Sequence, residues 1–526
     1  MGNLSQERRD YMLKFLNDLR LQNLDNVNYV RAINEIENAI NDKKYGLVWE
    51  SHTENVDEML KKHIPVLVDV DDKAICSKQK EKYNFLIEGD NLHSLKLLKK
   101  TYKGRVDIIY IDPPYNRGKN DFVYNDVYVD KNDEFKHSKW LSFMYHRLSL
   151  AKELLVKTGV VFISIDDNEQ AALKLLCNEI FGESNVETMI WAKESESNSG
   201  KMKNTKRFRD VHEYIIACYK NKDLVQFSKI NEALENGQFQ TTNLAKNNAN
   251  KSGAVDRIFE IVNPDNGKSW TDEWKYDKDT IDKLLNENLI WFGKTGNNKP
   301  RQILPTDDRR TVYVESIITQ GSSTQGRKDL ESVLGKDKFD NPKPVKLLKT
   351  LFTISGGSNS IILDFFAGSG TTGEAVVTLN REDKGNRTYI LCTNNQNRIC
   401  ETITYQRLLE IQKRLPHNLK YFKTEFVDKV TDDDLLEGKL IEYIKPLIEL
   451  EYFCNLDMSN MKIVLSEENF DELLESGCIP YNGKLFIASD ILASIDQQNL
   501  LAKNHCEIIR IPEYYYRDEL IEAGEL

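Results

Sequence analysis

The residues Asp112-Pro-Pro-Tyr115 stand directly after the apolar run 106–111, which we expect to be a buried strand. Pro113 and Pro114 have a fixed φ and no N–H, so the turn presents a carboxylate, carbonyl oxygens and a phenol ring as one stiff unit. This set suits a planar ring that carries an exocyclic amine. Asp112 and the Pro113 carbonyl would each accept one N–H, while Tyr115 stacks on the ring. A plain connecting loop is the alternative to this candidate catalytic site.

A second turn that could hold a ligand is the glycine-rich segment 364–373, which we expect between a strand and a helix. Its Gly368, Gly370 and Gly373 form a Gly-x-Gly-x-x-Gly pattern. Glycines at such a turn let the backbone approach a cofactor closely and leave the amides of the helix N-terminus facing it. The pattern alone fits a dinucleotide, another nucleoside cofactor or a purely structural turn.

The strand after the glycine-rich turn helps to separate these alternatives. Dinucleotide-binding proteins have an acidic residue at the end of that strand, about 20 residues further on. Here the strand leads into Asn394 and Asn395, and the next carboxylate is Glu401. A nicotinamide cofactor is therefore disfavoured, although either asparagine could hydrogen-bond a ribose.

A parallel sheet would position both turns. Because the predicted strands are largely apolar and alternate with helices, we expect an α/β fold with helices on both faces of the sheet. In such sheets ligands bind beyond the carboxyl ends of the strands, so the two turns are expected to share one site. We expect strands over 83–91, 106–112, 159–166, 359–366 and 387–393, and helices over 140–155, 171–181, 372–379 and 398–414.

Length and composition bound the remaining choices. A chain of 526 residues predicts several domains. Its 72 basic and 83 acidic residues give a net charge of −11, which argues against a surface coated by nucleic acid but allows a local basic groove. We find no apolar run of membrane-spanning length and no signal peptide. Eight scattered cysteines suggest neither a metal site nor disulfides, so we expect a cytoplasmic protein.

The α/β pattern stops between residues 193 and 335, where polar stretches carry clusters of basic residues with aromatic residues between them. We expect an inserted domain here. Such clusters are either a solvated face or a surface for DNA, and in the second case the affinity for a duplex falls steeply with salt. The basic residues are Lys201, Lys203, Lys206, Arg207, Arg209, Lys294, Lys299, Arg301, Arg309, Arg310, Arg327 and Lys328.

Taken together, these motifs resemble those of amino-group DNA methyltransferases that use S-adenosylmethionine, of the beta order class in which the catalytic motif precedes the cofactor motif. The chain is most similar to the modification (Mod) subunits of Type III restriction–modification systems. The resemblance covers roughly residues 45–190 and 335–415. It rests on Glu88-Gly-Asp-Asn-Leu-His-Ser-Leu95, Tyr110-Ile-Asp-Pro-Pro-Tyr-Asn-Arg-Gly118, Phe143-Met-Tyr-His-Arg-Leu148, Val161-Phe-Ile-Ser-Ile-Asp-Asp-Asn-Glu169, Asn341-Pro-Lys-Pro-Val-Lys-Leu-Leu348 and Asp364-Phe-Phe-Ala-Gly-Ser-Gly-Thr-Thr372.

The resemblance implies a role for each matching residue. The catalytic turn, Asp112 to Tyr115, would hold a flipped target base, and Asp90 would reach the adenine end of the cofactor. Lys343 and Pro344 would begin a helix near its methionine end. The implied cofactor-binding residues are Asp90, Asn91, Lys343, Pro344, Asp364, Phe366, Ala367, Gly368, Ser369, Gly370 and Asn394.

The resemblance also implies a domain plan around a Rossmann-like methyltransferase sheet. We expect a helical N-terminal region, two halves of the methyltransferase domain (catalytic, then cofactor-binding), a target-recognition insert between the halves and an α+β C-terminal interaction domain. These regions are, in chain order, 1–75, 76–192, 193–335, 336–425 and 426–526. Two departures from the family pattern are the missing acidic ribose partner and a short region after residue 425.

The function that follows is methylation of adenine N6 in double-stranded DNA, within a Type III-like restriction–modification system. Methylation of cytosine N4 is the alternative, because its amine has a similar geometry; Asp112 in place of a serine favours adenine by family analogy. A non-catalytic DNA-binding subunit and a nicotinamide-dependent oxidoreductase are further alternatives. The expected partners are DNA, a second copy of the chain and a restriction (Res) subunit, with no membrane.

Overall fold

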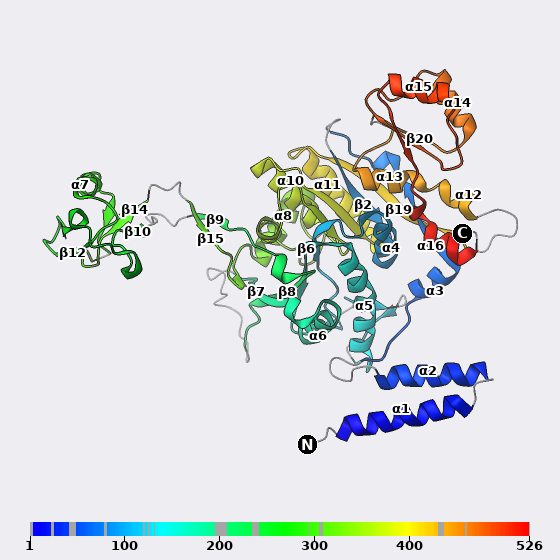
Figure 1. The fold of residues 1–526 in the computed structure, drawn as a ribbon, viewed down its shortest axis with the longest axis horizontal. Helices are drawn as coiled ribbons and strands as arrows, with labels where there is room; N and C mark the ends of the chain where they lie inside the picture. Colours follow the sequence, from blue (N-terminus) through cyan, green and yellow to red (C-terminus); the bar gives the residue numbers. More distant parts are fainter. Residues whose placement is uncertain are drawn as a thin grey trace. The chain divides into compact units, whose positions relative to one another are not determined.

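The computed structural model describes residues 4–22, 26–41, 49–77, 82–118, 121–124, 127–130, 132–194, 208–233, 241–293, 295–304, 309–429, 436–457 and 460–524 (Figure 1). The chain forms two compact units, which we describe separately. Unit 1 comprises Met1–Gln226 and Ser316–Leu526, and unit 2 comprises Phe227–Glu315. Within the described residues, no helix is long and apolar enough to cross a membrane.

Unit 1 is built on a ten-stranded sheet whose central six strands are parallel. Strand β1 pairs antiparallel at one edge, and β8 runs antiparallel between β6 and β7. In spatial order the strands are β1 (His63–Asp69), β19 (Asn418–Asp428), β2 (Tyr83–Glu88), β18 (Thr388–Thr393), β17 (Ile361–Asp364), β3 (Val106–Ile111), β6 (Leu155–Ile165), β8 (His212–Tyr219), β7 (Val186–Ala192) and β16 (Ile317–Ile318). This arrangement confirms the predicted Rossmann-like α/β fold.

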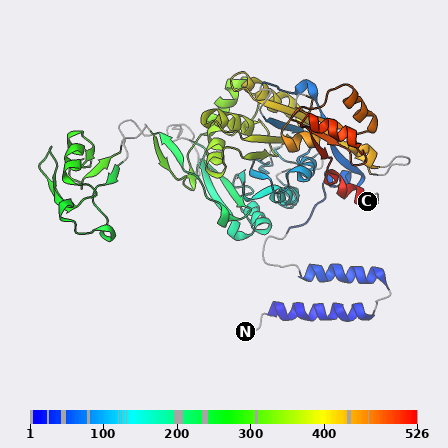
Figure 2. The same cartoon turned by 45° about the horizontal axis from the view of Figure 1, so that its top comes forward.

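Among the described residues, seven helices of unit 1 lie against the sheet in two groups, one on each face (Figures 1 and 2). The connections from β2 to β3 and from β3 to β6 run in one direction along the sheet, whereas those from β17 to β18 and on to β19 run in the other. Since parallel crossovers are right-handed, the two directions place their helices on different faces. One group is α4 (Asn91–Tyr102), α5 (Lys136–Leu154) and α6 (Gln170–Phe181); the other is α8 (Ser323–Leu334), α9 (Val345–Ser355), α10 (Thr371–Asp383) and α11 (Tyr405–Gln412).

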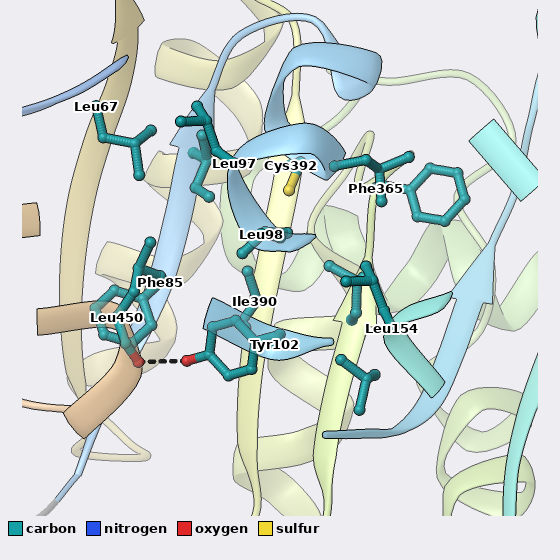
Figure 3. Packing of buried hydrophobic residues seen from close by; sticks show 14 of the residues in the cluster. Leu67, Phe85, Leu97, Leu98, Tyr102, Leu154, Phe365, Ile390, Cys392 and Leu450 are labelled. Carbon is teal, nitrogen blue, oxygen red and sulfur yellow. Dashed lines mark hydrogen bonds between the residues drawn. The ribbon is translucent and has the colours of Figure 1, made fainter. Parts of the chain in front are cut away.

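The main core lies between α4 and the parallel strands (Figure 3). Leu98 of α4, Phe85 of β2 and Ile390 of β18 belong to this core, and all three are fully buried. At the end of α4 the Tyr102 hydroxyl donates a hydrogen bond to the carbonyl of Leu450, which lies in α13 (Ile444–Tyr452). The C-terminal region therefore packs directly on the core of the main sheet.

The strand order reverses direction between β3 and β17, which are neighbours although 249 residues separate Ile111 from Ile361 along the sequence. Their register pairs Ile108 with Ile362 and Ile109 with Leu363. The turn Asp112–Tyr115 follows β3 and the glycine-rich turn follows β17, so both leave the same edge of the sheet. This edge is the topological switch point, where open α/β sheets bind their ligands.

The ends of unit 1 differ in detail from the predicted regions. The predicted helical region 1–75 contains α1 (Leu4–Gln22), α2 (Val27–Asn41) and α3 (Asn55–Lys62), but it also supplies strand β1. Strand β19 continues to Asp428, three residues past the predicted boundary at 425. The region after it consists of α12 (Leu436–Ile441), α13, β20 (Met461–Val464), α14 (Glu467–Glu475), β21 (Lys484–Ile487), α15 (Ile495–Lys503), β22 (Glu507–Arg510) and α16 (Arg517–Ala523), with β20, β21 and β22 in one parallel sheet.

Unit 2 is shorter than the predicted insert of 193–335, because β8 and β16 pair into the main sheet. It has its own small core around the fully buried Trp274. Of the predicted basic clusters, residues 201–207 and Lys294 lie outside the described residues. The elements of unit 2 are β9 (Ile230–Ala233), β10 (Thr241–Asn243), β11 (Ile258–Val262), β12 (Ser269–Glu273), α7 (Lys278–Asn286), β13 (Ile290–Trp291), β14 (Arg301–Ile303) and β15 (Arg309–Val312).

Candidate active site

The turn Asp112–Tyr115 is fixed in place by hydrogen bonds to its backbone and to the residue after it. The indole N–H of Trp140 in α5 donates to the Pro114 carbonyl at 2.7 Å. Asn116 is buried with a φ of 56°, a left-handed conformation that asparagine tolerates better than most residues. Its side-chain amide donates to Glu169 at 2.6 Å and to the Lys136 carbonyl at 3.1 Å. These contacts fix the direction in which Asp112 to Tyr115 leave the strand.

Tyr115 links two carboxylates within this site. Its hydroxyl lies 2.8 Å from Asp112 Oδ1 and 3.1 Å from Glu213 Oε2, so it can donate to either oxygen. Burial, together with these two charges, raises the pKa of Tyr115 well above its ordinary value. The phenol is therefore neutral and remains a hydrogen-bond donor.

Lys343 was predicted near the cofactor, and the structure places its ammonium in contact with Asp112 and Tyr115. Nζ lies 2.8 Å from both carboxylate oxygens of Asp112 and 2.8 Å from the Tyr115 hydroxyl. Burial alone would lower the pKa of Lys343, but the charges of Asp112 and Glu213 and the hydrogen bonds to Asp112 raise it above its ordinary value. Lys343 is therefore charged and is bound to Asp112 and Tyr115. Pro344 is the N-cap of α9, as the predicted helix start requires.

Glu213 is a site residue that the sequence analysis missed. It lies in β8, and its side chain is about one-tenth exposed. Its carboxylate is 3.5 Å from Lys343 Nζ and 3.6 Å from Lys193 Nζ. The only sequence signal was an acidic residue at the start of an apolar run, 213–219, and nothing in the sequence says that this run pairs with β6.

Arg117 lies at the partly exposed edge of the cluster that Tyr115, Glu213 and Lys343 form with Asp112. Its Nε donates to Asp166 at 2.7 Å, and its guanidinium carbon lies 4.8 Å from the centre of the Tyr115 ring. A guanidinium at this distance from an aromatic face is attracted to it. Arg117 therefore stiffens one side of the phenol ring that is predicted to stack on a base.

The glycine-rich turn is shaped by Asp364, whose carboxylate points back into its own loop. It accepts hydrogen bonds from the Phe366 N–H at 3.0 Å and the Thr372 hydroxyl at 2.6 Å. Gly368 and Gly370 have φ angles of 47° and 74°, which residues with a side chain rarely adopt. Asp364 thus organises the turn, and the backbone from Ala367 to Gly370, with the first amides of α10, is the part that can face a cofactor.

Burial raises the pKa of Asp364 to about 7, against an ordinary value of 3.8. Between these values the folded protein keeps a proton that the unfolded chain has lost. The free energy of unfolding should therefore fall as the pH rises through this window, by up to about 4 kcal/mol from this group. Asp364→Asn removes the effect, so we expect the variant to gain stability relative to the wild type between about pH 4 and about pH 7 in urea unfolding.

Asp383→Asn is the matched control for this measurement. A hydrogen bond from Arg387 lowers the pKa of Asp383, so this carboxyl, unlike Asp364, does not keep a proton on folding within the window. The stability difference between this variant and the wild type should stay constant there. A pH-independent difference for Asp364→Asn would contradict the assignment.

Asp90 and Asn91 connect the glycine-rich turn to α4 and α5. The side-chain amide of Asn91 donates to the Phe365 carbonyl at 3.2 Å, and the buried Arg147 donates to the Asn91 side chain at 2.5 Å. Asp90 caps α4 through the Leu92 N–H and keeps a partly exposed carboxylate, 3.4 Å from Arg147. Arg147 thus holds Asp90 and Asn91 in place, a role that was not predicted from the sequence.

The end of β18 is where a dinucleotide-binding protein would carry its acidic ribose partner. Asn394 is exposed there, and the Asn395 side chain donates to Glu88 Oε1 at 3.1 Å. Glu88 pairs with Thr393 across β2 and β18, so a carboxylate does lie at this strand end, supplied by the neighbouring strand.

The fold and the site together define a DNA methylase. A family model described as DNA methylase matches residues 106–405, and the chain belongs to this family. Three relatives refine the comparison. The Type III restriction-modification enzyme StyLTI Mod subunit of Salmonella typhimurium is 34% identical, over 67% of this chain and 59% of its own length. The EcoPI Mod subunit of Escherichia phage P1 is 31% identical, over 78% of this chain and 73% of its own length. The Type II methyltransferase M.KpnI of Klebsiella pneumoniae is 28% identical, over 64% of this chain and 90% of its own length.

Within the DNA methylase family, the chain is thus a relative of the Type III Mod subunits. Its match spans less than two thirds of the Salmonella protein.

Proposed function

We propose that this protein transfers a methyl group from S-adenosylmethionine to the N6 atom of an adenine in double-stranded DNA. The observation that carries the proposal is the position of the two turns. The acceptor turn Asp112–Tyr115 and the glycine-rich turn 364–370 leave neighbouring parallel strands at the switch point of one sheet.

The residues at this edge fit S-adenosylmethionine. The positive φ angles of Gly368 and Gly370 let the backbone approach a ligand, and a Cβ on Gly368 would lie 3.3 Å from Phe339. Asp90 would accept a hydrogen bond from the adenine of the cofactor, and Asn394 would bind its ribose. The cofactor, when bound, supplies an electrophilic methyl group.

The acceptor turn would prepare the target amine for this methyl group. The lone pair of an adenine amine is delocalised into the ring, so the amine is a poor nucleophile. Asp112 and the Pro113 carbonyl would each hold one N–H, which favours a nitrogen whose lone pair is free for in-line attack. Most of the rate enhancement would come from this positioning and from the fixed charges of the turn.

The target base must leave the duplex to reach Asp112. Extrusion costs a few kcal/mol, and stacking on Tyr115 would offset part of it. Cytosine N4 would fit the same acceptors, so adenine is favoured by the aspartate at position 112 and by the family.

We propose that the region 193–335, which includes unit 2, reads the DNA sequence. Its basic side chains would hold phosphates while other residues contact base edges. We also propose that the protein works as a homodimer and with a restriction subunit, since its relatives are the Mod subunits of Type III enzymes.

Methylation of a defined genome tests the proposed function. The gene should be expressed in a host that lacks DNA methyltransferases, and the genomic DNA digested to nucleosides and sequenced for modified bases. We expect N6-methyladenine at one short sequence. Methylcytosine would select the N4 alternative, and no modified base, from a protein that binds S-adenosylmethionine, would select the non-catalytic DNA-binding alternative.

A further inference from the structure

Lys343 binds the carboxylate of Asp112, which is the proposed acceptor for the target amine. Lys343 Nζ contacts both Asp112 oxygens at 2.8 Å, and an incoming amine needs one of these oxygens as the acceptor for its N–H. Both Lys343 and the Tyr115 ring are buried, so neither moves freely into water. An amine can therefore bind Asp112 well only if the ammonium of Lys343 has another place to go.

Glu213 provides that place. Its Oε2 is 3.5 Å from Lys343 Nζ, and a shift of about 0.7 Å would bring the pair to the length of a charge-assisted hydrogen bond. The Tyr115 hydroxyl bridges the two carboxylates, so it can donate to Asp112 or Glu213 as the ammonium moves.

We propose that Lys343 and Glu213 are positioning residues of the amine site: when an exocyclic amine binds Asp112, the Lys343 ammonium shifts from Asp112 to Glu213. This inference rests on the proposed function, because it concerns how the same site admits its base. Neither residue needs to touch the reacting nitrogen. Their effect is to keep Asp112 paired in the empty site and to release it when the base arrives.

The shift predicts an effect that depends on the amine itself. Two unmethylated duplexes that contain the recognition sequence should be compared. One has adenine at the target position, and the other has the unsubstituted base purine, which lacks the exocyclic amine. Their affinities are measured with S-adenosylhomocysteine bound, so that no transfer occurs. In Glu213→Gln the neutral amide is a weaker acceptor for Lys343, and we expect the preference for adenine over purine to fall about tenfold.

Removing the ammonium should remove the role of Glu213. In a Lys343→Met background, Glu213→Gln should change the preference by less than about twofold, so the two substitutions are strongly coupled. A Glu213→Gln variant that weakens both duplexes equally would overturn the inference. An effect of Glu213→Gln that is undiminished in the Lys343→Met background would also overturn the inference, because Glu213 would then act independently of Lys343.

If Glu213→Gln does not bind S-adenosylhomocysteine, we take the variant to be misfolded, and Lys343→Arg tests the inference instead. Lys343→Arg places a guanidinium against Asp112, which it can hold with two parallel hydrogen bonds. The preference for adenine should then fall while the affinity for the purine duplex is kept, and an equal loss on both duplexes would overturn the inference. If the wild type methylates no adenine, the proposed function fails; if it does and these preferences do not change, only the shift of Lys343 fails.

Discussion

Asp112→Ala is expected to lower the rate of methyl transfer at least about 1,000-fold while leaving the affinity for S-adenosylmethionine within about twofold. The substitution removes an acceptor for the target amine but leaves the glycine-rich turn intact. The buried Lys343 ammonium loses its two contacts to Asp112 and keeps Glu213 and the Tyr115 hydroxyl nearby. Tritium transfer to duplex DNA measures the rate, and calorimetry measures cofactor binding.

Two further variants sharpen the result for Asp112. Asp112→Asn keeps one acceptor oxygen and the shape of the side chain, so its rate should lie between those of the wild type and Asp112→Ala. Asp457→Ala is the matched control, since Asp457 is also paired with a lysine, Lys445 at 2.7 Å, in the C-terminal region. It should transfer methyl groups normally. Normal turnover by Asp112→Ala would refute the role of the acceptor turn.

The parts of the site that could be predicted from the sequence are those whose residues are consecutive along the chain. Asp112 to Tyr115 and Asp364 to Gly370 each form one turn, and an apolar run before each turn reveals the strand that carries it. The parallel sheet then places both turns at one edge, as the register of Ile108 with Ile362 confirms. Local sequence and one topological rule were sufficient for this much.

The role of Lys343 and the presence of Glu213 could not be predicted, because both depend on which strands pair. Glu213 reaches Tyr115 only because β8 lies antiparallel beside β6, with Ile165 opposite Tyr214. Nothing in the residues 213–219 fixes that register. Strand β1 was missed for a related reason: its seven residues follow a helix and become a strand by pairing with β19.

The second large effect is expected from Gly370→Trp, which should raise the Kd for S-adenosylmethionine at least about 100-fold. Gly370 has a φ of 74°, and a Cβ there would lie 3.4 Å from the side chain and the carbonyl oxygen of Thr404. An indole extends well beyond that Cβ and has to displace either Thr404 or the turn itself. Since the backbone of the turn is the proposed cofactor contact, binding should fail. Calorimetry with S-adenosylmethionine measures the loss.

Gly335→Trp separates this effect from a general cost of tryptophan at a left-handed position. Gly335 has a φ of 83°, so the backbone strain is comparable, but no atom lies within 4 Å of a Cβ placed there. This variant should lose some stability and keep its affinity for the cofactor. If both variants lose affinity equally, the loss comes from backbone strain alone, and if Gly370→Trp binds normally, the glycine-rich turn does not hold the cofactor.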